Sequence, residues 1–294
     1  MKIGLNTNTF PGAPLPDIIA LAKKLGVGYL ELWASNLDTN AQAANQYSFA
    51  NKNVAGAKKL IDEAGLKVGC LAFGMGLDKA FFESPEAYAK EFLCAIETAR
   101  AWGVNRVLHY GVGLFDGYEM DVDKLARFWS EPIALAEKYG IVLAIENEPI
   151  DFTYTPENMR ALLDAFPSPS FKTNYDATNY FHSGNEPFPH AYDLLRGDIA
   201  YVHIKNGKLY DPKFCLDPDW ICDLPMTRAL TGKLLYYCDT DKGVVNTMGL
   251  LSALQADGYD GMCTLEEPQV IREKAIEAIR REVLTLRNSG YFTD

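Results

Sequence analysis

The sequence lacks the features that mark several large classes of protein. It has no run of about 18 apolar residues, so no segment is expected to cross a membrane. The first ten residues contain no apolar signal core, which favours a cytoplasmic protein. Lysine and arginine number 28 against 39 aspartates and glutamates, and the net charge of -11 opposes a nucleic-acid partner, which would need clustered basic residues. A small-molecule partner is therefore expected.

Paired cysteine motifs are also missing. None of the six cysteines forms a CxxC motif, and several lie in apolar segments, which favours buried reduced thiols. Three of them, Cys215, Cys222 and Cys238, share one loop-rich stretch, but their spacing lacks the ligand pattern of a structural zinc site. The others are Cys70, Cys94 and Cys263.

What the sequence does contain is a regular alternation of strand and helix patterns. The predicted strands are Lys2–Asn8, Gly28–Trp33, Lys67–Phe73, Arg106–Tyr110, Ile141–Glu146, Phe171–Asp176, Ile199–Ile204 and Met262–Glu266. The predicted helices include Leu15–Leu25, Ala55–Ala64, Pro85–Trp102, Val122–Tyr139, Pro156–Phe166 and Val270–Leu286. Eight such units without a break in composition predict an α/β fold, a (β/α)8 TIM barrel formed as a single domain over residues 1–294, ahead of a doubly wound open sheet.

Helix-end signals agree with this order. A glycine follows five of the helical patterns and precedes a strand, as in Leu25-Gly26 and Tyr139-Gly140, where a left-handed helix end favours glycine. Ser84 and Thr155 each precede a proline and a glutamate, the pattern of a helix N-cap.

One irregular stretch interrupts the alternation. Residues Asn206–Asn246 form a long insertion between the seventh and eighth predicted strands, rich in tyrosine, aspartate and proline. Long insertions on the catalytic face of a barrel often form lids or substrate walls. A contact between copies of the chain in a homo-oligomer is the alternative.

Four of the eight predicted strands end in residues that bind hard cations: Glu146, Asp176, His203 and Glu266. In a barrel these strand ends meet at one rim, where catalysis takes place. Three ionised carboxylates about 4 Å apart would repel each other by roughly 4 kcal/mol per pair at an effective dielectric constant of about 20. Protons or a divalent ion such as Mn2+ or Mg2+ must neutralise them. A single acid at a strand end is more often a cap, so this prediction depends on all four residues and on the barrel.

The strand-end motifs IENEP, NYDATNYFHSG, YVHIKNG and GYDGMCTLEEP resemble the sugar phosphate isomerase/epimerase group of the xylose-isomerase-like TIM-barrel superfamily, which also includes AP endonuclease family 2. The resemblance implies that Glu146, Asp176, His203 and Glu266 bind one divalent metal ion, with Mn2+ first and Mg2+, Co2+ or Zn2+ as alternatives. It also implies that Glu146 and Glu266 transfer a proton through a metal-stabilised enediolate. Glu148 lies on the same strand face as Glu146, so the role assigned to Glu146 could belong to Glu148 instead.

Further residues are candidates for substrate binding. His109 ends the fourth predicted strand, where it would contact either the substrate or the core, and Lys205 follows His203 on the same strand face. The aromatic residues Phe10, Trp33 and Phe73 would form a wall for a sugar ring or pack in the core. Asn179 stands where several ketose 3-epimerases have histidine. His182 and His190 lie in predicted loops and are expected to be solvated.

The sequence therefore predicts an isomerase or epimerase of a ketose or keto-sugar. No glycine-rich phosphate loop is visible and arginines are scarce at the expected rim, which favours an unphosphorylated substrate. A metal-dependent lyase or deglycosidase of an oxidised glycoside would use the same first proton transfer. A non-catalytic sugar-binding barrel is the third alternative, and DNA repair is the weakest.

Overall fold

Eight parallel strands form a closed barrel. The computed structural model describes residues 1–37, 48–50, 52–76, 83–113, 120–268 and 272–293. Around the barrel the strand order is β1-β11-β7-β6-β5-β4-β3-β2. Apart from β1 and β11, which close the barrel, neighbouring strands therefore follow one another in the sequence, because β8, β9 and β10 belong to the insertion and not to the barrel. The strands are β1 (Lys2–Asn6), β2 (Tyr29–Trp33), β3 (Lys67–Phe73), β4 (Arg106–His109), β5 (Val142–Glu146), β6 (Phe171–Asp176), β7 (Ile199–Ile204) and β11 (Met262–Leu265). The predicted TIM barrel is confirmed.

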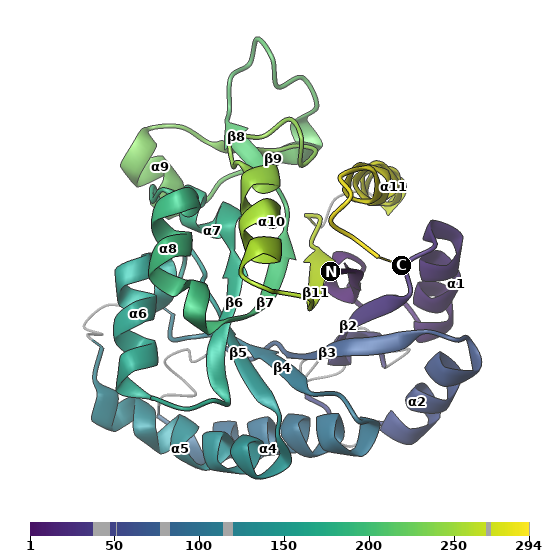
Figure 1. Cartoon of the computed structure of the whole chain (residues 1–294), viewed down its shortest axis with the longest axis vertical. Helices are drawn as coiled ribbons and strands as arrows, with labels where there is room; N and C mark the ends of the chain where they lie inside the picture. Colours follow the sequence, from purple (N-terminus) through teal and green to yellow (C-terminus); the bar gives the residue numbers. More distant parts are fainter. Residues whose placement is uncertain (38–47, 51, 77–82, 114–119, 269–271, 294) are drawn as a thin grey trace.

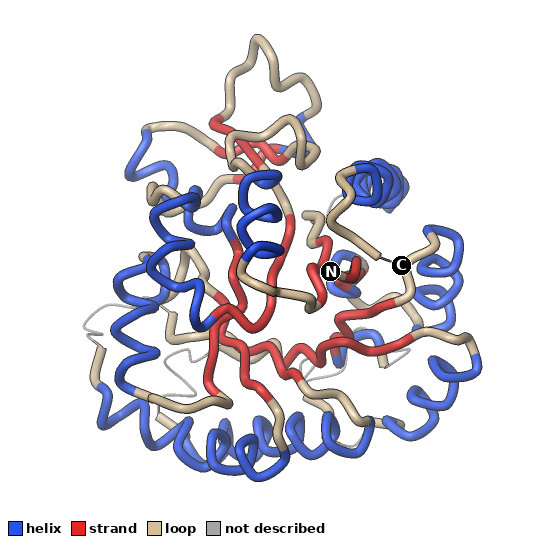
Figure 2. The backbone as a smooth tube through the Cα atoms, in the orientation of Figure 1, coloured by secondary structure: helices blue, strands red, loops and turns tan. Residues whose placement is uncertain are grey.

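Helices cover the outside of the strands, as Figures 1 and 2 show. They are α1 (Leu15–Leu25), α2 (Val54–Glu63), α4 (Pro85–Trp102), α5 (Val122–Tyr139), α6 (Pro156–Ala165), α7 (Ala177–His182), α8 (Tyr192–Leu195), α10 (Thr247–Ala256) and α11 (Arg272–Asn288). The predicted start of the last helix at residue 270 lies outside the described residues. Within the described residues, no helix combines the length and the apolar character that crossing a membrane requires.

Most of the predicted helix ends have the expected backbone. Gly26 and Gly140 follow α1 and α5 with φ of +72° and +64°, the left-handed conformation that favours glycine. The Thr155 hydroxyl accepts a hydrogen bond from Asn158 N at 3.1 Å and so caps α6. Ser84 is the N-cap residue of α4, as predicted, but its side chain makes no capping hydrogen bond.

Strand residues alternate between two packed regions. The barrel interior contains one small apolar cluster, made of Trp33, Cys70, Ala72, Leu108, Ala144, Tyr201 and Met262. A much larger core includes the apolar faces of the helices. Because both faces of every strand are buried, alternate side chains of one strand belong to different regions.

The insertion folds into its own small structure. It contains a three-stranded antiparallel sheet in the order β8-β10-β9, made of β8 (Gly207–Leu209), β9 (Ile221–Cys222) and β10 (Leu235–Tyr237). Helix α9 (Pro225–Thr231) lies between β9 and β10 in the sequence. This unit projects at the top of the view in Figure 1. All six cysteines are free. Phe214 and Leu216 lie in the insertion and are 74% and 79% exposed.

Candidate functional site

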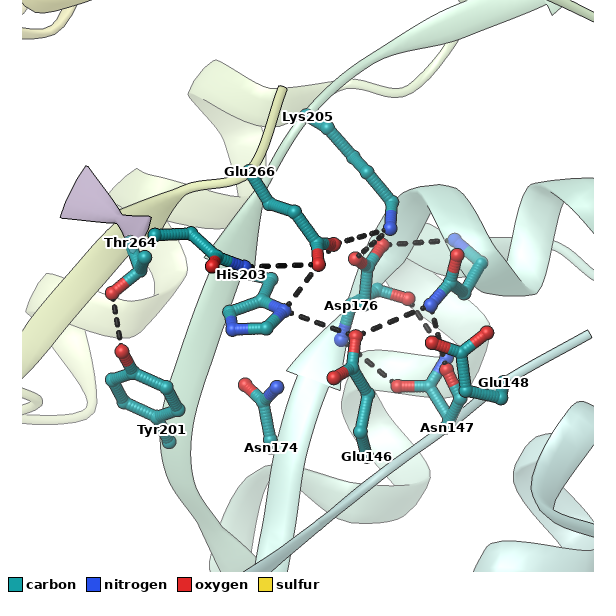
Figure 3. Close-up of polar contacts among 12 residues, drawn as sticks. Glu146, Asn147, Glu148, Asn174, Asp176, Tyr201, His203, Lys205, Thr264 and Glu266 are labelled. Atoms are coloured by element: carbon teal, nitrogen blue, oxygen red, sulfur yellow. Dashed lines mark hydrogen bonds and ion pairs between the residues drawn. The ribbon is translucent and has the colours of Figure 1, made fainter. Parts of the chain in front are cut away.

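The four predicted strand-end residues meet in the structure. Glu146 and Asp176 end β5 and β6, His203 lies near the end of β7, and Glu266 directly follows β11. Each offers one ligand atom, and these atoms lie within 4.8 Å of one another. Figure 3 shows their side chains pointing toward one another. Parallel strands bring them together because their C-terminal ends share one rim, and Asp176 is directly opposite His203 in the sheet.

His203 lies among three carboxylates. Its Nδ1 atom is 3.0 Å from Glu146 Oε1 and 3.4 Å from Glu266 Oε2, and its Nε2 atom is 2.6 Å from Glu31 Oε2. Burial lowers the pKa of His203, but the carboxylates of Glu146, Glu31 and Glu266 outweigh burial and raise the pKa well above its usual value. An Nε2–H group that donates to Glu31 leaves Nδ1 as the atom that can bind a metal.

Glu31 is itself held by a buried network. Trp33 Nε1 donates to Glu31 Oε1 at 2.9 Å, and the Tyr201 hydroxyl donates to Glu31 Oε2 at 2.7 Å. Trp33 packs in the small cluster of the barrel interior, so its observed role is to position Glu31. Its predicted role as a sugar wall stays a prediction.

Lys205 partly compensates the negative charge of the cluster. Its Nζ atom is 2.9 Å from Asp176 Oδ2 and 2.5 Å from Glu266 Oε2. Burial raises the pKa of Glu266, but Lys205 and His203 together hold that pKa well below its usual range. Burial raises the pKa of Glu146 to about 7, against the opposing effect of His203. The two glutamates therefore have unequal proton affinities.

The donor set fits a divalent cation. Glu146 Oε2 is fully buried and has no hydrogen-bond partner among the described residues. A buried acceptor without a partner is costly, and it points to a missing positive group at this position. Three carboxylates and one imidazole suit Mn2+, Mg2+ and related ions. The predicted metal centre therefore has a physical basis in this arrangement.

Two asparagines hold Asp176 in place, one through its backbone and one through its carboxylate. Asn147 Nδ2 donates to the Asp176 carbonyl at 2.8 Å, and Asp176 N donates to Asn147 Oδ1 at 2.9 Å. Asn179 N donates to Asp176 Oδ1 at 2.9 Å, and Asn179 Nδ2 lies 3.3 Å from Glu146 Oε1. Asn179, predicted to contact substrate, thus also orients two of the metal-binding candidates.

A cavity of about 210 Å³ opens beside the cluster. Its described lining residues are Asn6, Asn8, Thr9, Glu148, Pro149, Asn179, His182, Lys205, Leu224, Tyr237, Glu266, Glu267 and Pro268. This volume is below the roughly 300–1,000 Å³ of pockets for drug-sized ligands, so it suits a small substrate. Leu224 and Tyr237 come from the insertion, which supports its predicted role as a substrate wall.

The sequence profile of the xylose isomerase-like TIM barrel family matches residues 19–288. The chain belongs to this family. No curated protein matches the sequence.

Solved structures share the fold at low identity. The IolI protein with a bound zinc atom is 17% identical, with a TM-score of 0.71 and 100% of both chains covered. The probable 3-DHS dehydratase AsbF from Bacillus anthracis is 18% identical, with a TM-score of 0.70 over 98% of this chain and 99% of that one. D-allulose 3-epimerase from Methylomonas sp., in complex with D-allulose, is 16% identical, with a TM-score of 0.69 over 98% and 97%. Identities this low establish the fold alone.

Two residues that were candidates for substrate binding pack in the core, and a contact of either with substrate stays a prediction. His109 and Phe73 are fully buried outside the barrel interior, where His109 packs on Phe92, Trp129 and Phe171 and Phe73 packs on Phe92. The reason is strand alternation: Leu108 and Ala72 belong to the interior cluster, so the next residue of each strand faces the helices. The core alternative for His109 is the observed one.

Phe10 belongs to the large core and is 5% exposed. It is not among the described residues that line the cavity, so a direct role against a sugar stays a prediction. Lys205 and Asn179, in contrast, both line the cavity.

Two features of the site are not predicted from the sequence. His182 was expected to be solvated, but it ends α7 and is fully buried in the cavity wall. A helical interpretation of Ala177–His182 would have placed it on the same face as Asn179, three residues earlier. The role of Glu31 was also missed, because its distance in sequence from His203 gives no local signal.

Proposed function

We propose that this xylose isomerase-like barrel is a divalent-metal-dependent isomerase or epimerase of a ketose or keto-sugar. The observation that carries the proposal is the convergence of Glu146, Asp176, His203 and Glu266, whose ligand atoms lie within 4.8 Å of one another beside a small cavity. The neighbour solved with D-allulose supports a ketose as the substrate class.

The same four residues would hold the cation, with Mn2+ as the first choice and Mg2+, Co2+ or Zn2+ as alternatives. A bound divalent ion supplies Lewis acidity that polarises a substrate carbonyl. Glu31 and Asn147 keep His203 and Asp176 in place before substrate arrives. Such preorganisation lowers the cost of reaching the reactive geometry.

Glu146 and Glu266 would transfer the proton. They come from β5 and β11, which are separated around the barrel by β6 and β7, so they approach a substrate from two sides. One carboxylate accepts the proton of the carbon beside the carbonyl, and the other carboxyl group, initially protonated, gives a proton to the opposite face of that carbon. The carbon is thereby inverted and the two carboxyl groups exchange protonation states, which solvent then resets.

A metal-dependent lyase is the second candidate, because the probable dehydratase AsbF shares this fold. A lyase, or a deglycosidase of an oxidised glycoside, removes the same proton and then expels a group from the adjacent carbon. Analysis of the product separates the two: an isomer supports the first proposal, and an unsaturated product with a released group supports the second.

Solvent deuterium incorporation tests the proton transfer directly. The metal-loaded protein is incubated with a panel of ketoses in D2O, and exchange at carbon is followed by NMR. We expect Glu146→Gln and Glu266→Gln to lower the exchange rate by about 10²- to 10⁴-fold, the usual contribution of a general acid or base.

Glu277→Gln, an exposed substitution of the same kind on α11, is the control and should keep the wild-type rate. Unchanged exchange in both active-site variants would remove the proposed acid and base. Ketose binding without exchange in the wild type would favour a non-catalytic sugar-binding barrel.

A further inference from the structure

His182 is a buried side chain without a polar partner in the wall of the cavity. It is 0% exposed, and neither of its ring nitrogens has a hydrogen-bond partner among the described residues. Leaving a buried polar group unpaired costs about 1–3 kcal/mol. Because His182 is one of the residues that line the cavity, a bound molecule can supply the missing partner.

The insertion builds the surroundings of this imidazole. The Tyr237 ring lies edge-on to it, with 5.4 Å between centroids, and the Thr227 hydroxyl donates to the His182 carbonyl at 2.5 Å. Gly207 on β8 lies close to the ring, where a Cβ would be 3.7 Å from His182 Nε2 and 3.2 Å from the Tyr236 carbonyl. The insertion therefore fixes the helix end that carries His182 and encloses its ring.

The charges around the ring favour a neutral ligand. Burial lowers the pKa of His182 well below its usual value, Lys205 adds to this effect, and Glu266 opposes it. A neutral imidazole offers one donor and one acceptor, which matches a hydroxyl group. The described lining residues include no arginine, and their one lysine, Lys205, is already ion-paired with Asp176 and Glu266. A phosphate group would therefore find no unpaired lysine or arginine among the described lining residues.

We propose that His182 and Tyr237 form a subsite that binds a hydroxyl group of an unphosphorylated ketose, beyond the carbons that react at the cluster. This inference rests on the proposed function and narrows it to free sugars. His182 acts here in binding and specificity, and the insertion is the element that creates the subsite.

Binding measurements separate this inference from the catalytic proposal. The metal-loaded protein is titrated calorimetrically with D-allulose, D-fructose and L-ribulose, using the wild type, His182→Leu, His182→Gln and the control His190→Leu. His190 is an exposed histidine paired with Glu157, so its variant should bind as the wild type does. We expect His182→Leu to weaken binding of the preferred ketose about 3- to 10-fold, the effect of one hydrogen bond, and His182→Gln to recover part of the loss.

Unchanged affinity in His182→Leu would overturn the subsite, as would a wild type that binds none of the three sugars. Binding that depends on His182 without any deuterium exchange would contradict the catalytic proposal and leave the subsite supported. If His182→Leu does not fold, the wild type decides: D-fructose should bind more tightly than D-fructose 6-phosphate, and tighter binding of the phosphate ester would overturn the inference.

Discussion

Two fully buried histidines at strand ends of this barrel have opposite surroundings. His203 on β7 lies within 3.4 Å of the carboxylates of Glu31, Glu146 and Glu266. His109 on β4 lies among the rings of Phe92, Trp129 and Phe171, and its Nδ1 atom is 3.2 Å from the Tyr110 carbonyl.

The two surroundings push the ring charge in opposite directions. The carboxylates raise the pKa of His203 well above its usual value in spite of burial, whereas burial lowers the pKa of His109 to about 3. Equal burial therefore does not define a histidine's role. The strand face on which a histidine lies determines whether its ring is charged, because one face meets the acidic cluster and the other meets the helices.

Replacing each of the two histidines by phenylalanine should give the largest difference, in the free energy of unfolding. In the metal-free protein at pH 7.5, His203→Phe removes a buried cation from three carboxylates and should lower the free energy of unfolding by about 3–5 kcal/mol. His109→Phe places an apolar ring among aromatic rings and should change it by less than about 1.5 kcal/mol. Urea denaturation measures both, and equal losses in the two variants would contradict the assignment of their surroundings.

The link between Glu31 and His203 can be tested through metal affinity. Glu31→Gln weakens the acceptor that fixes His203 Nε2, so we expect the affinity for Mn2+ to fall about 10- to 100-fold. Glu282→Gln is the matched control, because Glu282 is also buried but binds Thr240 instead of the cluster. If both variants bind Mn2+ as the wild type does, Glu31 has no positioning role.

A smaller effect is expected in the pH dependence of the free energy of unfolding, to which His109 contributes. Burial lowers the pKa of His109 from about 6.5 in the unfolded chain to about 3 in the folded protein, so below about pH 6.5 the unfolded chain takes up a proton that the folded chain does not. His109 thus lowers the free energy of unfolding by up to about 1.4 kcal/mol per pH unit as the pH falls from about 6 to 4.

His109→Phe should remove this part of the slope, and His190→Phe, at an exposed histidine, should keep most of it. Denaturation curves at pH 7.5, 6 and 5 make the measurement. Identical slopes in the wild type and His109→Phe would show that His109 is protonated in the folded protein.

The barrel was predictable because its signals are local and repeat. Every predicted barrel strand is present, with ends shifted by at most two residues. The first strand stops at Asn6 instead of Asn8, because the Asn6 side chain accepts a hydrogen bond from Asn8 N and caps a short 3-10 helix at Thr7–Thr9. The sheet of the insertion was not predicted, since strands of two or three residues carry no readable alternation.

The metal-binding candidates were predictable for a second reason: a charged residue at the end of an apolar strand is conspicuous, and the barrel brings such ends together. The direction of His109 and Phe73 was not predictable, since strands buried on both faces show no polar alternation that distinguishes interior from exterior. The burial of His182 depends on an insertion far along the chain, which no local pattern reveals.

Metal stoichiometry tests the central claim most directly. Protein stripped with a chelator is titrated with Mn2+, and bound metal per chain is measured by mass spectrometry and electron paramagnetic resonance, for the wild type and for Asp176→Asn combined with His203→Gln. The shared site of Glu146, Asp176, His203 and Glu266 predicts one tightly bound ion per chain in the wild type and its loss in the double variant. A wild type that binds no divalent ion, or a double variant that binds Mn2+ equally well, would contradict it.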